Sequence, residues 1–164
     1  MESSNFAIHP LDVGGGQVAL SPIPGRFGSY NFDLTTILHW APDLVLTMTT
    51  QSELDCMGAS GFGDDLEVVG VAWRHLPIVD FAAPVAEAEN AWGEVLTLSV
   101  NILAQGGRIL THCFGGCGRS GMVALRLMIE TGETPEGALK RLRKTRPCAV
   151  ETDAQQRWAI RSSA

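Results

Sequence analysis

Hydrophobic and polar residues follow two different periods along this chain. Apolar and β-branched residues run together over 44–50 and 66–78, which predicts one buried strand in the first segment and one or two strands in the second. Over 84–107 apolar residues recur at helical spacing and the segment closes with two glycines, which predicts a long amphipathic helix. The run 108–113 returns to the pattern of a short strand.

Further helices are marked by residues that favour helix N-termini. Three expected N-caps each precede a helical pattern: Asp33, Thr134 and Thr152. A proline follows Thr134 at the first helical position, and a glutamine follows Thr152 three residues later in a capping-box pattern. The segment 120–132 is apolar nearly all round, which predicts a buried helix.

Strands therefore alternate with helices along most of the chain. This order predicts an α/β fold: a central, mostly parallel, twisted sheet of about five strands flanked by helices. The first 30 residues are rich in Gly and Pro and predict a short strand that leads into a loop, while 52–65 predicts a turn region with at most a short helix. With 164 residues, one domain over 1–164 is expected.

Composition narrows the possible partners. The net charge of −6 argues against a general nucleic-acid-binding protein. The basic run 140–146 is interpreted mainly as a solvated helix face, with a surface that attracts anionic substrates as the second reading. No apolar run reaches the roughly 18 residues that span a bilayer, and no secretory signal is visible, so we expect no membrane partner and a cytoplasmic location. The oligomeric state stays open.

The chain has four cysteines: Cys56, Cys113, Cys117 and Cys148. A chain of this size does not depend on disulfides for stability, and no export signal is present. We therefore expect reduced thiols with a catalytic or redox role.

Two of these thiols lie in a glycine-rich turn, HCFGGCGRSG, at 112–121. The turn joins the strand 108–113 to the buried helix, a place where backbone N–H groups and the helix dipole favour an anion. Arg119 offers a planar fork of donors that can hold two oxygens of a phosphate. A thiolate beneath that phosphate can attack phosphorus and form a covalent phosphocysteine.

Spacing selects Cys113 as the nucleophile. Five residues separate Cys113 from Arg119, enough to encircle an anion, whereas one residue separates Cys117 from Arg119. Cys117 is interpreted as an inert residue of the loop wall; the alternative is that Cys117 or Cys56 forms a disulfide with oxidised Cys113.

The turn resembles the HCxxGxxRSG signature of cysteine-dependent protein tyrosine and dual-specificity phosphatases. The segments 75–84 and 134–159 are similar to further parts of small bacterial members of that family, so the resemblance covers roughly 40–160. Cys148 departs from the pattern, because the family usually has glycine at this place.

The resemblance implies the role of each residue in the signature. Cys113 would be the nucleophile, Arg119 would bind the phosphate, and Ser120 would hydrogen-bond the thiolate, although a serine here is also a good N-cap. His112 would orient the loop without transferring protons. The phosphate would lie against the backbone of a continuous set of residues: Phe114, Gly115, Gly116, Cys117, Gly118 and Arg119.

Residues outside the signature complete the expected site. Asp80, in HLPIVDFAAP, is the expected general acid for the leaving oxygen, with Asp64 or Asp65 as the fallback. Gln155 is the candidate for positioning the hydrolytic water, with Glu151 as a weaker one. The expected function is hydrolysis of phosphate monoesters on protein tyrosine, with serine and threonine as further targets, on a phosphorylated protein or peptide and without cofactor or metal.

Three other functions would use some of the same residues. A metal site would use His75, His112, Cys113 and Cys117, but the thiols lie within one glycine loop and no second CxxC pair exists. A module that binds phosphorylated ligands without turnover would need no intact set of catalytic groups. A redox enzyme of the arsenate reductase type would use two neighbouring thiols.

Overall fold

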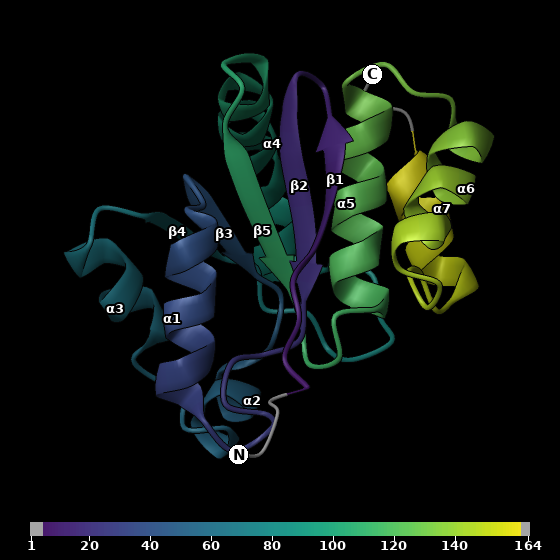
Figure 1. Cartoon of the computed structure of the whole chain (residues 1–164). Helices are drawn as coiled ribbons and strands as arrows, with labels where there is room; N and C mark the ends of the chain where they lie inside the picture. Colours follow the sequence, from purple (N-terminus) through teal and green to yellow (C-terminus); the bar gives the residue numbers. More distant parts are fainter. Residues whose placement is uncertain (1–4, 162–164) are drawn as a thin grey trace.

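A five-stranded sheet forms the centre of the structure, a computed structural model that describes residues 5–161 (Figure 1). Its strands in chain order are β1 (His9–Val13), β2 (Gly16–Ser21), β3 (Leu44–Thr47), β4 (Ala72–His75) and β5 (Arg108–His112). In space they follow the order β1-β2-β5-β3-β4. β1 pairs antiparallel with β2 and the other pairs are parallel, which confirms the predicted mostly parallel sheet.

Helices cover both faces of this sheet. They are α1 (Tyr30–Trp40), α2 (Gln51–Cys56), α3 (Phe62–Val68), α4 (Ala86–Ala104), α5 (Gly118–Glu130), α6 (Pro135–Thr145) and α7 (Asp153–Ile160). Figure 1 shows α1 and α3 on one side and α5, α6 and α7 on the other. Neighbouring residues of a strand point to opposite faces of the sheet and pack into different hydrophobic cores. Ile109 packs into the core on the α4–α5 side, and Leu110 packs into the core on the α1–α3 side.

Three parts of the N-terminal half differ from the sequence-based expectation. The expected single strand and loop are an antiparallel hairpin, whose turn at Gly14 and Gly15 has φ of +55° and +95°. α1 begins after Ser29, which accepts a hydrogen bond from the N–H of Phe32; Asp33 is buried and accepts one from the N–H of Gly25 instead. The expected turn region contains α2 and most of α3.

The parallel register places the carboxyl ends of four strands at one edge. His112 of β5 pairs with Ser21 of β2 on one side and Thr47 of β3 on the other, and Thr47 pairs with His75 of β4. Ligands of open α/β sheets bind at this edge. The glycine-rich turn follows β5 directly, so the fold places it there.

Some expectations about extent reach past the described residues. One domain over 1–164 stays a prediction, because residues 1–4 and 162–164 lie outside the part that the structure describes. Within that part, none of the helices is both long and apolar enough to cross a bilayer.

Candidate active site

Cys113 lies where β5 ends and the glycine-rich turn begins. Its side chain is buried, and its Sγ lies 3.2 Å from the Oγ of Ser120. α5 starts at Gly118 with Cys117 as N-cap, so the alternative role of Ser120 as an N-cap does not hold; the helix begins earlier than Ser120. Ser120 is instead in the first turn of α5, where its hydroxyl can donate to the Cys113 sulfur.

The carbonyl groups of the turn all point away from Cys113. Every carbonyl oxygen of residues 112–117 accepts a hydrogen bond from a group that lies outside the ring of the turn. The donors are the N–H of Met48, Ile23, Gly121 and Val150 and the side chains of His112, Arg26 and Arg146. This arrangement fixes the orientation of each peptide plane.

The N–H groups of the turn face the other way. Because a trans peptide directs its N–H opposite to its C=O, carbonyls held behind the turn leave the N–H groups on the side of Cys113. Within residues 5–161, the N–H groups of 114–119 donate to no protein acceptor. Gly116, with φ of +74°, lies so near Ser21 that a Cβ would come within 2.6 Å of its carbonyl carbon. The turn is thus a nest for an anion.

Arg119 completes this nest with a buried guanidinium. Its Nη1 and Nη2 donate to the carboxylate of Glu53 at 2.8 and 2.7 Å, and Nη1 also donates to the carbonyl of Ile78 at 2.9 Å. The Nε has no partner among the described residues although it is buried. Such a donor is costly unless something accepts from it, and a phosphate oxygen can.

Glu53, which binds the guanidinium of Arg119, is a residue of the site that the sequence did not predict. It is the N3 residue of α2, in a capping box with Thr50. Burial raises the pKa of Glu53, but the hydrogen bonds from Arg119 and Thr50 outweigh it and lower the pKa overall. Burial lowers the pKa of Arg119, but its hydrogen bonds with Glu53 and the negative charge of that carboxylate outweigh this effect and raise the pKa overall. The spacing of Thr50 and Glu53 is typical of a helix start. Nothing in the sequence indicates that Glu53 contacts Arg119.

His112 links the turn to the sheet through a chain of hydrogen bonds. Its Nδ1 lies 3.3 Å from the carbonyl of Cys113, so this nitrogen donates, and its Nε2 then accepts from Thr47 Oγ1 at 2.7 Å. Thr47 Oγ1 in turn accepts from the indole of Trp73 at 2.8 Å. Burial lowers the pKa of His112 to about 4, so the ring is neutral at pH 7 and holds the turn.

Asp80 lies at the mouth of the site, in the loop after β4. Its side chain is 48% exposed, and its Oδ1 accepts from the N–H of Phe81 at 3.0 Å and lies 3.3 Å from Nη2 of Arg119. The cavity above Cys113 has a volume of about 290 Å³. Its rim is formed by Arg26, Asp80, Phe81, Phe114, Arg146 and Glu151.

Cys117 is joined to Cys148 by a disulfide, which corrects the expectation of four reduced thiols. The connection between α6 and α7 folds back against the glycine-rich turn and brings the two Cα atoms to 5.1 Å, although they are 31 positions apart in the sequence. Cys113 and Cys56 remain free. Cys148, at the place where the family usually has glycine, therefore staples the turn from outside.

Other predicted residues take different places. The amide of Gln155 is buried, accepts from the N–H of Glu151 and Thr152, and donates to the carbonyl of Ala82, so the structure shows the capping role; the water-positioning role stays a prediction. The cavity rim includes Glu151 but neither of the fallback acids, and Asp65 accepts from the hydroxyl of Tyr30. Among residues 5–161, the structure contains no cluster of three or more metal-ligating side chains.

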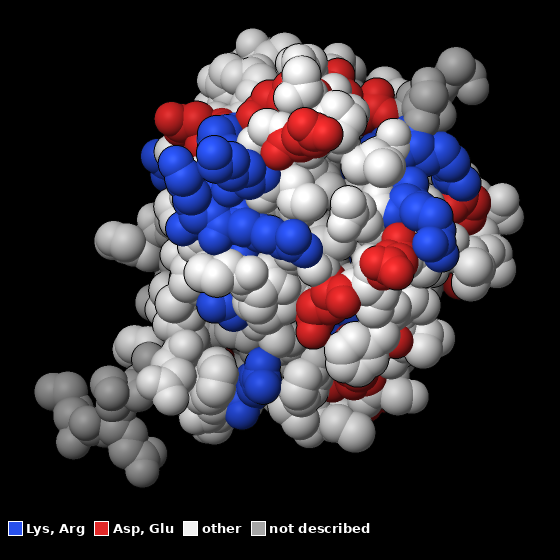
Figure 2. Space-filling view, turned by 90° about the vertical axis from the view of Figure 1, so that its right-hand side faces the viewer, with Lys and Arg blue, Asp and Glu red and all other residues white. Residues whose placement is uncertain are grey.

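Most of the basic run 140–146 has structural partners. Figure 2 shows Lys and Arg side chains gathered on the face of α6 and α7, with acidic side chains beside them. Arg143 donates to the carbonyls of Ala149 and Val150, and Arg146 donates to the glycine-rich turn. The run therefore holds the α6–α7 connection in place, and only Arg146 reaches the cavity rim.

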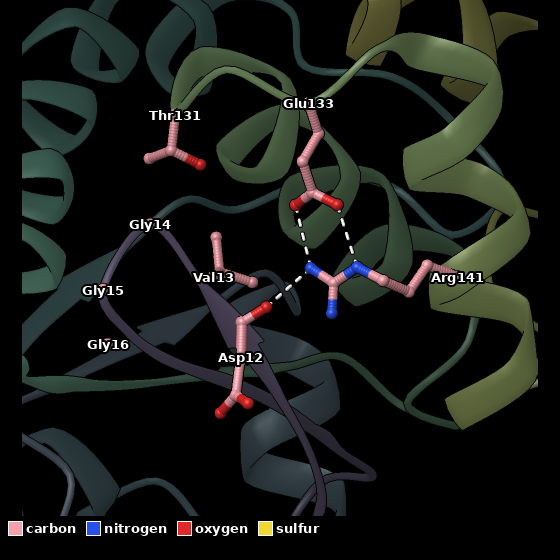
Figure 3. Close-up of a pocket in the computed structure, with 8 residues that line it drawn as sticks. All are labelled: Asp12, Val13, Gly14, Gly15, Gly16, Thr131, Glu133 and Arg141. Carbon is pink, nitrogen blue, oxygen red and sulfur yellow. Dashed lines mark hydrogen bonds and ion pairs between the residues drawn. The ribbon is translucent and has the colours of Figure 1, made fainter.

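A second cavity, of about 510 Å³, lies at the opposite end of the sheet beside the β1–β2 turn (Figure 3). Its charged groups satisfy one another: Arg141 donates to both carboxylate oxygens of Glu133 at 2.8 Å and to the carbonyl of Asp12 at 2.6 Å. This arrangement ties α6 to the hairpin.

The site agrees with comparisons to known proteins. Residues 44–133, more than half of the chain, match the family described as a polymorphic toxin system, DSP-PTPase phosphatase. The chain belongs to this phosphatase family. A solved structure of Tk-PTP in the active form is 31% identical, with a TM-score of 0.71 and 92% of each chain covered.

The chain is also similar to a curated protein and to a further solved structure. Human cyclin-dependent kinase inhibitor 3 is 30% identical over 118 residues, which is 70% of this chain and 54% of that protein. The chain thus spans about half the length of the curated relatives it matches. The structure of kinase-associated phosphatase, with its catalytic-site cysteine replaced by serine, has a TM-score of 0.83 at 22% identity over 96% of this chain and 94% of that chain. At this identity the match shows the shared fold.

Proposed function

We propose that this protein hydrolyses phosphate monoesters on phosphotyrosine-containing proteins, and on phosphoserine and phosphothreonine as further substrates. One observation carries the proposal: six consecutive N–H groups surround a buried thiol, with Nε of Arg119 beside it, and none of these donors has an acceptor within residues 5–161. This donor set suits three phosphate oxygens held above the sulfur of Cys113.

In the first step, the thiolate of Cys113 attacks phosphorus in line with the leaving oxygen. The S–P bond forms as the P–O bond to the substrate breaks, and the carboxyl proton of Asp80 passes to the departing oxygen. Arg119 and the N–H groups of the turn stabilise the charge on the three transferring oxygens. The products are a phosphocysteine and the free hydroxyl of the substrate.

In the second step, water attacks the phosphocysteine. Asp80, now a carboxylate, takes a proton from the water as the O–P bond forms and the S–P bond breaks. The electron pair returns to the Cys113 sulfur, where the hydroxyl of Ser120 at 3.2 Å can donate to it. Inorganic phosphate leaves, and Asp80 is again protonated.

The cavity supports a shallow rather than a deep substrate site. Asp80 is almost half exposed at its mouth, and the turn between Cys113 and Arg119 contains no other basic side chain. The positive charge inside the turn thus suits one phosphate group.

The cytoplasmic location stays a prediction. The Cys117–Cys148 disulfide is of a kind more common in oxidising compartments.

The test is turnover together with capture of the intermediate. We expect the wild type, but not Cys113→Ser, to release phosphate from para-nitrophenyl phosphate and from a phosphotyrosine peptide. Acid quenching during turnover should trap one phosphoryl group on the protein, detected by mass spectrometry on the peptide that contains Cys113. Cys56→Ser is the matched control, because Cys56 is a free, exposed cysteine outside the site, and it should behave as wild type.

Two results would redirect the assignment. Binding of a phosphotyrosine peptide without turnover by the wild type would indicate a binding module. Thiol-dependent reduction of arsenate without phosphate release would indicate the redox alternative.

A further inference from the structure

Two arginines stand at the cavity rim without a carboxylate partner. Arg26, in the loop between β2 and α1, is exposed; its guanidinium lies 4.8 Å from the ring centroid of Phe114, and its Nη1 is 3.4 Å from the Phe114 carbonyl. Arg146, the C-cap of α6, is half-buried and uses Nε and Nη2 on the carbonyls of Gly116 and Gly115 at 3.1 and 2.9 Å. Among residues 5–161, neither forms an ion pair.

Both side chains keep donors that are free for a ligand. Nε and Nη2 of Arg26 and Nη1 of Arg146 form no hydrogen bond within the described residues. Contact with the glycine-rich turn holds each guanidinium in place, so less side-chain freedom is lost when an anion binds. Because they contact the outer carbonyls of the turn, they lie outside the ring of N–H groups that faces Cys113.

The cavity rim therefore carries charges of both signs. Arg26 and Arg146 supply positive charge, whereas Asp80 and Glu151 supply negative charge at the same cavity. In a chain with a net charge of −6, these two arginines supply local positive charge that can attract an anion to the rim. A substrate that carries a second negative charge beside its phosphate can satisfy both the nest and these arginines.

We propose that Arg26 and Arg146 form a subsite for an acidic residue next to the phosphorylated residue of a peptide substrate. This inference rests on the proposed function. A peptide fits better than a lipid headgroup for two reasons. The second charge is bound at the rim and not inside the turn. Apolar surface suited to peptide side chains also borders the subsite, from the exposed Phe27 and Phe81 and the half-buried Phe114. The arginines thus determine specificity and take no part in the chemical step.

The test uses three phosphotyrosine peptides that differ only in the flanking residues: glutamate, glutamine or lysine. An exposed ion pair contributes about 0.2–1 kcal/mol, so each arginine should raise kcat/KM for the glutamate peptide over the glutamine peptide by about 1.4- to 5-fold. Arg26→Gln should remove its share of this ratio, and the lysine peptide should be the poorest substrate of the three. High salt should reduce the wild-type preference.

Controls separate the subsite from general loss of function. Arg157→Gln makes the same change at an exposed arginine of α7 that lies away from the cavity rim, and it should keep the wild-type ratio. Arg146→Gln also loses the bonds to the turn, so its overall rate will fall; the ratio between two peptides cancels that loss. Arg146→Lys keeps the charge and should keep part of the preference.

The outcomes distinguish the two proposals. Equal kcat/KM for the glutamate and glutamine peptides, or an unchanged ratio in Arg26→Gln, would overturn the subsite while leaving phosphatase activity intact. Failure of the wild type to hydrolyse any phosphotyrosine substrate would overturn the proposed function. The subsite would then still be tested by the ratio of the dissociation constants of the glutamate and glutamine peptides, measured on Cys113→Ser. A higher kcat/KM for a phosphoinositide in phosphatidylcholine vesicles than for the glutamate peptide would overturn the choice of a peptide.

Discussion

Loss of the Cys117–Cys148 disulfide should cost a large part of the stability of this domain. The bond closes a loop with a sequence separation of 31 residues. The chain-entropy relation gives about 12 cal/mol/K for a loop of this length, or about 3.7 kcal/mol at 25 °C. Cys148 is exposed, so Cys148→Ser removes the cross-link with little loss of packing. For a chain of this size, a loss of 3–4 kcal/mol lowers Tm by about 10 °C.

The measurement is urea unfolding of wild type and Cys148→Ser with and without reductant. Without reductant, the variant should unfold at lower urea, with the free energy of unfolding reduced by about 3–4 kcal/mol. With reductant, the two should converge, because the wild type then lacks the cross-link as well. Cys56→Ser is the control, since it removes an exposed free cysteine, and its unfolding should follow wild type under both conditions.

Two results would refute this reasoning. Equal stabilities of wild type and Cys148→Ser without reductant would show that the bond contributes nothing to folding. Detection of more than the two free thiols, Cys56 and Cys113, in non-reduced denatured protein would show that the bond is absent. Because Arg146 still ties the turn through two hydrogen bonds in the variant, we expect a larger effect on stability than on turnover.

Three further predictions concern the site. Asp80→Asn should lower kcat on a phosphotyrosine peptide by about 100-fold or more and less on para-nitrophenyl phosphate, whose leaving group needs a proton less; equal losses on both substrates would contradict the general-acid role. Glu53→Gln should lower kcat/KM by about tenfold, since charged hydrogen bonds contribute about 1.5–3 kcal/mol. Folding lowers the pKa of Glu53, so its contribution to stability is present at neutral pH and is lost in acid. The urea midpoints of wild type and variant should therefore converge at acidic pH. Burial lowers the pKa of His112 from 6.5 to about 4, so the unfolded chain binds a proton at a higher pH than the folded chain does. The free energy of unfolding should therefore fall by roughly 3 kcal/mol as the pH drops from 6.5 to about 4. An equal dependence of the unfolding free energy on pH in His112→Asn would contradict this prediction.

The features that the sequence predicted correctly are those set by neighbouring residues. The Thr134–Pro135 start of α6 and the Thr152 capping box of α7 depend on contacts within one turn of helix, and the long helix α4 follows from apolar residues that recur at helical spacing. The order of strands and helices was enough to predict the mostly parallel sheet, whereas phosphate binding by the turn from Cys113 to Arg119 stays a prediction.

The features that the sequence did not predict fall into two groups. Local signals existed for some: the glycine pair of the β1–β2 turn favours a hairpin, and Thr50 with Glu53 is a capping box that marks α2. For others no local signal exists. Glu53 meets Arg119 across 66 residues of sequence, and Cys148 meets Cys117 only because the α6–α7 connection folds back.

The same distinction explains what the signature motif can specify by itself. The residues 112–121 supply the thiol, the guanidinium and a flexible backbone, but an isolated turn of this sequence could direct its carbonyls as readily as its N–H groups toward an anion. The structure decides between these orientations through donors far away in sequence: the N–H of Ile23 and of Met48, the guanidinium of Arg146 and the N–H of Val150. Each binds a carbonyl on the outer side of the turn: Ile23 follows β2, Met48 follows β3, and Arg146 and Val150 lie in the α6–α7 connection. The polarity of the nest is therefore a property of the folded domain, and changes at any of these distant donors should weaken phosphate binding without altering the motif.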